Sequence, residues 1–319
     1  QCCPDVGGIM AIAEPFQPRG QPSMFRLHRG QGQVGCGGGA EQVLLDGQER
    51  ARGHAYFRVT EAEHSPDHKL FMWAEDVEGG DRHRICVRDL ETGLISTTPN
   101  ADAYGWHGVA FSPDSQYVFW IWRDPLSRPV KVFRRPARGG DDVLVYTEPD
   151  PALFMGLSRT ASNSHVVIHI LGPDVDEVRL IPASEPMLVE PRQPGLHYRV
   201  QEWAGDLIIL TDADGALDGK LMRAGLTQRA RAYWRDWVPH RPGCHILETL
   251  SFRDHFVRLQ RVEGRLEIVV TGRDGRENTL SFDEAAYAIT LAPVQEPGGT
   301  ILRLIYESPR TPRQWLDYD

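Results

Sequence analysis

The sequence predicts an all-β fold, a seven-bladed β-propeller whose end blades are incomplete. Three observations support this prediction: a phrase repeated at a long spacing, a strand that is apolar on both faces, and a scarcity of helical patterns. The phrase "SPDHKLFMW" begins at Ser65, and "SPDSQYVFW" begins 47 residues later at Ser112. A repeat of this length is typical of propellers and solenoids, in which each repeat is one supersecondary unit.

Weaker copies of the phrase follow, each a polar or Gly/Pro-rich turn before a run of branched and aromatic residues, which is a strand pattern. They occupy residues 157–171, 202–215, 251–264 and 291–308. A second strand-and-turn element recurs between the copies, at 84–95, 131–146, 177–190, 220–238 and 266–282, and residues 24–47 resemble a first copy without its leading half. Each full unit then holds about four strands, as a propeller blade does. The chain has room for about seven units, with six or eight as the alternatives.

The first copy contains four consecutive apolar residues, Leu70 to Trp73. Because successive side chains of a strand point to opposite faces of its sheet, this strand needs cover on both sides, as stacked blades provide. In "SPD", proline presets a turn, and the serine and aspartate side chains can accept hydrogen bonds from nearby backbone N–H groups. The best helical candidate, 226–236, is short and interrupted. We therefore expect an irregular N-terminal segment at 1–23 and one propeller domain at 24–319.

Composition limits the classes of partner. The formal net charge is −9 and the pI is about 5.8, which disfavours nucleic acid because phosphate binding needs basic patches. No apolar run approaches the length of a membrane span, so no membrane partner is expected. The N-terminus is a poor match to a signal peptide. The five cysteines are sparse and unpatterned, which fits a reducing compartment and predicts a cytoplasmic location.

Several motifs resemble cofactor, metal or catalytic sites, but none of them meets the requirements of such a site. "GQGQVG" (30–35) matches a dinucleotide loop, but it is followed by a turn and a strand pattern where a helix is required. A proline separates His64 from His68, so they do not share a helical face for zinc. "TDADGALDG" (211–219) misses the calcium-loop spacing, and Cys244-His245 is a dipeptide with no fold holding nucleophile and base together. We therefore predict neither a metal nor a cofactor.

The nucleophile elbow G-x-S-x-G of serine hydrolases is absent from the sequence; "GLSRT" (156–160) lacks the final glycine. An alternating β-α pattern that would hold a catalytic triad is also missing. We therefore predict no catalytic residue in this chain, so any hydrolase chemistry would belong to another domain.

The amino-acid sequences of seven segments resemble the β-propeller of the prolyl oligopeptidase family, especially its oligopeptidase B branch. These segments are 41–59, 64–76, 87–93, 127–135, 141–160, 234–243 and 306–319. The resemblance implies a propeller that covers an α/β-hydrolase domain, which would carry the catalytic triad and is missing from this chain. It also implies short peptide substrates, cleaved after basic residues, that the propeller admits while it excludes larger chains.

Two residues are carried over from this resemblance. Glu148, in "VYTEPDP", matches an acidic position of the oligopeptidase B branch, so we expect it to attract a basic substrate side chain. Arg128, in "SRP", is expected to reach the partner hydrolase domain. The alternatives are a solvated acid in a turn and an ordinary surface arginine.

Two other functions remain open at this point. The first is a free-standing propeller that acts as a scaffold for proteins or peptides. The second is a propeller enzyme with a central metal, of the lactonase kind, which would bind calcium.

Overall fold

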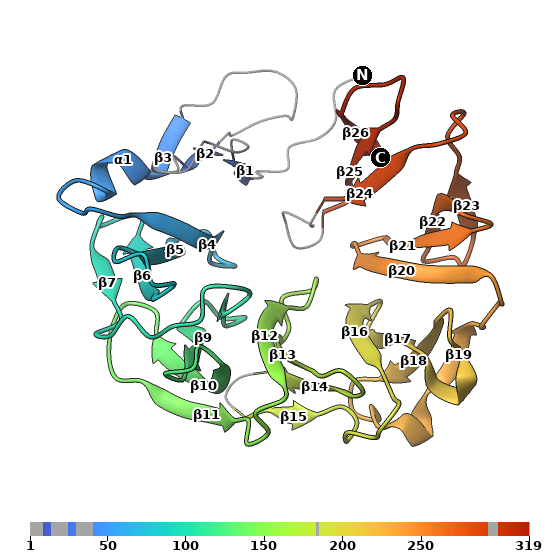
Figure 1. Ribbon diagram of the computed structural model, residues 1–319, viewed down its shortest axis with the longest axis horizontal. Coiled ribbons are helices and arrows are strands. Elements are labelled where there is room, and N and C mark those ends of the chain that lie inside the picture. The colour runs from blue at the N-terminus through green and yellow to red at the C-terminus, as the bar shows by residue number, and fades with distance from the viewer. Residues whose placement is uncertain (1–8, 14–24, 30–40, 183–184, 293–298, 319) are drawn as a thin grey trace. The chain divides into compact units, whose positions relative to one another are not determined.

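The computed structural model describes residues 9–13, 25–29, 41–182, 185–292 and 299–318 (Figure 1). These residues form seven antiparallel sheets that follow one another along the chain. The first and last sheets have three strands, and the five between them have four. Within every sheet, each strand pairs with the next one in sequence. Successive four-stranded meanders are the architecture of a β-propeller, so the predicted fold class is confirmed, whereas the number of blades stays a prediction.

The strands of the first three sheets are β1 (Ile9–Ala13), β2 (Phe25–Arg29) and β3 (Glu41–Leu45); β4 (Arg58–His64), β5 (Leu70–Asp76), β6 (Arg84–Asp89) and β7 (Ile95–Thr97); and β8 (Val109–Phe111), β9 (Tyr117–Arg123), β10 (Pro129–Pro136) and β11 (Val143–Thr147). Those of the fourth and fifth sheets are β12 (Phe154–Arg159), β13 (Val166–Leu171), β14 (Asp176–Ile181) and β15 (Met187–Leu188); and β16 (Tyr198–Trp203), β17 (Asp206–Thr211), β18 (Lys220–Gly225) and β19 (Arg235–Val238).

Those of the last two sheets are β20 (Cys244–Ser251), β21 (His255–Val262), β22 (Arg265–Gly272) and β23 (Glu277–Leu280); and β24 (Ala288–Leu291), β25 (Leu302–Glu307) and β26 (Gln314–Tyr318). Helical structure in the described ranges is limited to α1 (Gly47–Arg50) and two 3₁₀ turns, Ala213–Gly215 and Arg231–Tyr233.

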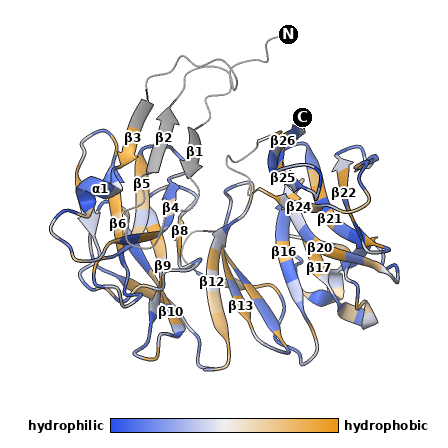
Figure 2. Cartoon of the chain, turned by 45° about the horizontal axis from the view of Figure 1, so that its top comes forward, coloured by the Kyte–Doolittle hydropathy of each residue, from blue (hydrophilic) through white to orange (hydrophobic). Residues whose placement is uncertain are grey.

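The chain divides into two compact units. Unit 1 comprises residues 1–158 with 182–185, and unit 2 comprises 159–181 with 186–319. Within each unit, apolar side chains fill the space between neighbouring sheets. In unit 2, one cluster joins β14 to β16–β18, a second joins β17 and β18 to β20 and β21, and a third joins β21 and β22 to β24 and β25. Figure 2 shows hydrophobic stretches along strands such as β6 and β12, joined by largely hydrophilic connections.

Strand β5 in unit 1 shows why the sequence has an unbroken apolar run. All seven of its residues are buried. Leu70 and Met72 pack on one face, against the β8–β11 sheet, whereas Phe71 and Trp73 pack on the opposite face with residues of β3. Burying a side chain of this size stabilises the fold by about 1.5–3 kcal/mol. The strand is therefore covered on both sides, as the apolar run predicted.

The two "SPD" phrases form the same turn. The Ser65 hydroxyl donates to the Asp67 carboxylate at 2.6 Å and accepts from the Leu70 backbone N–H at 2.9 Å. The Ser112 hydroxyl donates to Asp114 at 2.6 Å and accepts from the Tyr117 N–H at 2.9 Å. Both serines are therefore structural residues that start the second strand of their sheets.

One expectation needs correction. Residues 9–13, within the segment expected to be irregular, form β1 and pair with β2, because the apolar run "IMAIA" is long enough for one short strand. The segment 226–236, the best helical candidate and described as short and interrupted, contains the 3₁₀ turn Arg231–Tyr233 and the start of β19, which agrees with the expected scarcity of helices.

Candidate functional site

Glu148 follows β11 and is 3% exposed. Its carboxylate accepts a hydrogen bond from the Tyr146 hydroxyl at 3.0 Å and one from the Asp150 backbone N–H at 2.9 Å, and its own N–H donates to the Val130 carbonyl at 2.8 Å. The carboxylate is therefore held in a fixed position by its own turn. Its role in substrate binding stays a prediction.

Arg128 lies between β9 and β10 and is partly exposed. Its guanidinium donates twice to one Asp124 carboxylate oxygen, at 2.9 and 2.6 Å. Hydrogen bonds from this side chain and from the Arg128 backbone hold the pKa of Asp124 below its usual value. This ion pair lies within the loop between β9 and β10. In the predicted contact, Arg128 would bind the hydrolase domain either in addition to Asp124 or in its place. That contact stays a prediction.

Two glutamates on β4 form an acidic site that the sequence did not single out. The Glu61 carboxylate accepts hydrogen bonds from the backbone N–H groups of His107 and Gly108. The Glu63 carboxylate accepts one from the Phe111 N–H at 3.0 Å. Burial, reinforced by the charge of Glu63, raises the pKa of Glu61 to about 7. Glu61 can therefore exchange a proton near neutral pH. The sequence signal that could have revealed this site is the pair of acids, Glu61 and Glu63, at alternating positions of one strand.

A serine, a histidine and a carboxylate also meet in unit 2. The Ser164 hydroxyl lies 2.6 Å from Nδ1 of His165 and donates to the Glu202 carboxylate, which is itself 3.5 Å from the same Nδ1. A catalytic triad needs the serine on one ring nitrogen and the acid on the other. Burial opposes the charge of Glu202, but hydrogen bonds from His165 and Ser164 outweigh it and lower the pKa of Glu202 to about 2. The arrangement therefore keeps Glu202 ionised and does not activate Ser164 as a nucleophile.

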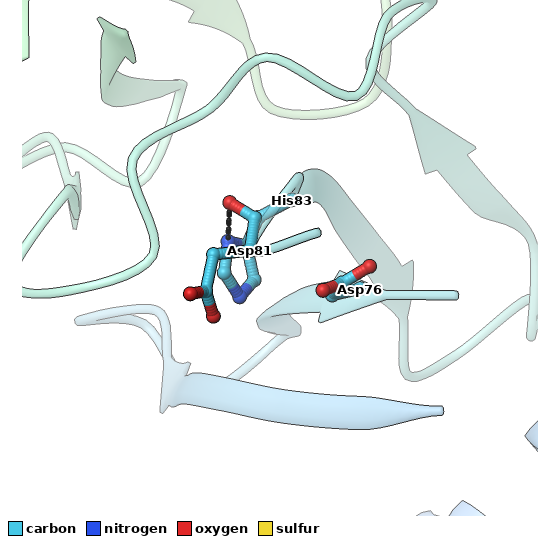
Figure 3. A group of neighbouring side chains, drawn as sticks. All are labelled: Asp76, Asp81 and His83. Carbon is cyan, nitrogen blue, oxygen red and sulfur yellow. Dashed lines mark hydrogen bonds between the residues drawn. The ribbon is translucent and has the colours of Figure 1, made fainter. Parts of the chain in front are cut away.

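One group in the described ranges has the composition and spacing of a metal site. Asp76, Asp81 and His83 each offer one ligand atom, and these atoms lie within 4.8 Å of one another (Figure 3). Asp76 ends β5 and His83 precedes β6, so the hairpin between these strands brings the three together. These three residues have no local sequence signal, because they are separated by a loop whose path no local pattern reveals.

The other sequence candidates take different places. Asp212, Asp214 and Asp218 bind separate partners: the His197 N–H at 2.8 Å, the Lys220 ammonium at 3.0 Å and the Gly243 N–H at 2.9 Å, in that order. The "GQGQVG" motif lies outside the described residues.

His64 and His68 face each other with ring centroids 4.6 Å apart. Cys244 is buried as a free thiol. No helix in the part of the chain that the structure describes has the length and apolarity to cross a membrane.

Comparison with known proteins gives concordant matches. The family model for the prolyl oligopeptidase N-terminal β-propeller domain matches residues 24–319. Dipeptidyl aminopeptidase BI of Pseudoxanthomonas mexicana is 30% identical over 280 residues, which are 85% of this chain and 38% of that protein. Protease 2 of Moraxella lacunata is 29% identical over 283 residues, 86% of this chain and 40% of that protein. The chain thus spans about two fifths of the length of these relatives.

Solved structures show the same fold. Oligopeptidase B from Leishmania major superposes with a TM-score of 0.82 at 22% identity, covering 93% of this chain and 44% of that one. Oligopeptidase B from Trypanosoma brucei, in its closed form with covalently bound antipain, also gives a TM-score of 0.82, at 23% identity, over 93% of this chain and 43% of that one. With a family match over residues 24–319 and relatives consistent with the oligopeptidase B branch, the chain belongs to the prolyl oligopeptidase family as its N-terminal β-propeller domain.

Proposed function

We propose that this propeller controls access to the active site of a serine peptidase whose catalytic residues lie in an α/β-hydrolase domain outside the 319 residues. The observation that carries the proposal is the family match over 24–319, together with relatives that are named as peptidases. A domain with this role needs no nucleophile of its own. It acts by sterically excluding folded or long chains while short peptides reach the catalytic serine.

The proposed substrates are short peptides cleaved after basic residues. The similarity to Protease 2 and to oligopeptidase B supports this class. The net charge of −9 supports it independently, because an acidic surface raises the local concentration of basic ligands. Glu148 is the residue that we propose for contact with the basic side chain. A cytoplasmic location is proposed as well, supported by the buried free thiols of Cys86 and Cys244.

Labelling with a fluorophosphonate probe, which reacts with activated serines, tests whether the catalytic serine lies outside the 319-residue chain. The genomic reading frame that contains this chain is expected to encode a domain with G-x-S-x-G. The protein expressed from that frame should be labelled, whereas the 319-residue chain should not. Labelling of the 319-residue chain itself would show that its own serines react and would overturn the proposal.

Access is tested with the labelled protein from the complete reading frame. A short peptide and a long unfolded polypeptide carrying the same basic cleavage sequence are compared by kcat/KM. We expect the short peptide to be cleaved and the long polypeptide to be resistant. Equal cleavage of both would refute the gating role while leaving the peptidase assignment intact.

A second specificity is favoured by one relative. Dipeptidyl aminopeptidase BI is 30% identical, and its name describes removal of dipeptides from an amino terminus. Mass spectrometry of the products of one peptide with an internal basic residue separates the two. Dipeptide ladders from the amino terminus would support this second specificity, and single internal cuts after the basic residue would support the first.

A further inference from the structure

The hairpin between β5 and β6 buries two polar atoms that have no hydrogen-bond partner in the described structure. Asp76 and His83 are both 0% exposed. Oδ1 of Asp76 accepts from the N–H groups of Glu78 and Gly79, each at 2.9 Å, whereas its Oδ2 has no partner. Nε2 of His83 has none either. Since buried polar atoms are nearly always paired, this pair requires an explanation.

The proton on the imidazole ring can be assigned from its other nitrogen. Nδ1 of His83 lies 3.0 Å from the Asp81 backbone carbonyl oxygen. A carbonyl only accepts, so Nδ1 carries the hydrogen, and Nε2 of a neutral ring presents a lone pair. Two buried lone pairs, on Nε2 and on Asp76 Oδ2, therefore lack a donor or cation.

We propose that Asp76, Asp81 and His83 bind a divalent transition-metal ion of the Zn²⁺ class. Nε2 of His83 and Oδ2 of Asp76 are the buried ligands, and the Asp81 carboxylate, which is 62% exposed, is the mobile third ligand. Imidazole with carboxylates suits such ions, and three protein ligands leave a position for water. The remaining contacts also fit, because metal-binding histidines usually donate their other N–H to a carbonyl or carboxylate.

Neighbouring positive charges do not occupy the site. Arg58 approaches the Asp81 carboxylate at 3.5 Å, but both side chains are largely exposed, so this ion pair is weak and can exchange. Arg123 donates to the Gly80 carbonyl at 3.2 Å and to the Ser127 hydroxyl at 3.2 Å. With two carboxylates facing the ion, the local charge favours a divalent cation.

The ion would join the hairpin to the segment before β8. The Ala103 N–H donates to the His83 carbonyl at 2.9 Å. A Cβ placed on Gly105 would lie 2.3 Å from Cε1 of His83, so the imidazole ring rests directly on this glycine. A metal on Nε2 would fix the ring in that position and hence stabilise the contact between two neighbouring sheets of unit 1.

Asp76→Asn is the deciding variant. Asparagine keeps an oxygen for the N–H groups of Glu78 and Gly79 and places an amide donor where Oδ2 faced Nε2, so the variant should fold without metal. After dialysis against a chelator, the 319-residue chain is titrated with Zn²⁺ by calorimetry. We expect one site in the wild type, weakened at least about 100-fold by Asp76→Asn, and a zinc-dependent rise in Tm that the variant lacks.

Two further variants keep the result interpretable. Asp81→Asn changes an exposed residue and should weaken Zn²⁺ binding about tenfold with no change in folding. Asp89→Asn is the matched control, because Asp89 accepts from the N–H groups of Glu91 and Thr92 in the same kind of turn, and it should bind as the wild type does. Co²⁺ in place of Zn²⁺ should give visible absorption bands that only Asp76→Asn and Asp81→Asn reduce.

Three results would overturn the proposal. The first is a wild-type chain that binds neither Zn²⁺ nor Co²⁺. The second is binding that Asp76→Asn and Asp81→Asn leave unchanged, which would place the ion elsewhere. The third is nitrogen NMR of the metal-free chain showing both ring nitrogens of His83 protonated at neutral pH, because an imidazolium would pair with Asp76 directly.

Discussion

Glu61→Gln is expected to stabilise the chain at alkaline pH and to leave its stability at acidic pH nearly unchanged. Burial raises the pKa of Glu61 from 4.5 to about 7 in the folded state. Below about pH 4.5 the folded and unfolded states both hold the proton, so the neutral side chain contributes fully. As the pH rises from 4.5 through 7, the unfolded state loses the proton first, and the folded state loses relative stability.

The magnitude follows from the size of the shift. Each pKa unit corresponds to about 1.4 kcal/mol, so the shift sets an upper limit of about 3.5 kcal/mol on the free energy lost above pH 7. The side chain is half-buried, and solvent contact reduces the expected loss to about 1–2 kcal/mol. Glutamine keeps the oxygen that accepts from the backbone of His107 and Gly108, and it cannot ionise. The variant should therefore recover this amount.

Urea unfolding at pH 5 and pH 8.5 measures the effect. The wild type and Glu61→Gln should have similar free energies of unfolding at pH 5, and the variant should be more stable by about 1–2 kcal/mol at pH 8.5. Glu91→Gln, in an exposed turn, is the control and should show no such pH dependence. An equal difference between Glu61→Gln and the wild type at both pH values would refute the reasoning. The stability change would then not depend on the ionisation of Glu61.

Three further predictions follow from single contacts. Ser65→Ala and Ser112→Ala should each lower the free energy of urea unfolding by about 1–3 kcal/mol and by similar amounts, because each leaves the same kind of N–H without its acceptor; very unequal losses would contradict the equivalence of the turns. Gly105→Ala should lower Tm clearly, because a Cβ there lies 2.3 Å from the His83 ring, and an unchanged Tm would show that the ring moves freely. Glu148→Gln should reduce kcat/KM for basic peptides by a few-fold at low salt in the protein from the complete reading frame, with a neutral-substrate rate that does not change.

The fold was predictable because its main signals are local. The "SPD" phrase encodes a serine hydroxyl and an aspartate that bind backbone groups within five residues, so most hydrogen bonds of each turn are local. The apolar run of β5 indicates that both faces of the strand are buried, but it does not identify the residues that cover them. By contrast, β1 was missed because five apolar residues make one short strand only when a partner such as β2 is available.

The candidate sites were harder to predict because they depend on contacts between sheets. Glu61 binds backbone N–H groups that lie 46 and 47 residues further along the chain, and burial is the main cause of its raised pKa. Asp76 and His83 come together only because the β5–β6 register pairs Glu75 with Arg84 and leaves the next residue on each side at the hairpin end. Neither relation has a local motif. Glu148 illustrates the opposite case, since a family resemblance selected it and the structure adds its burial and its bonds to Tyr146 and Asp150.

Two of the sites described above in unit 1, Glu61 and the group around His83, contact the same stretch of chain, the segment between β7 and β8. Glu61 binds the backbone at its C-terminal end, at His107 and Gly108, whereas His83 contacts its centre through Ala103 and Gly105. Deprotonation of Glu61 strengthens its acceptor character toward those N–H groups while adding a buried charge, and a cation on His83 would fix the ring beneath Gly105. Glu61 and His83 therefore both contact one connection, the segment between β7 and β8, and not only the packed strands on either side of it.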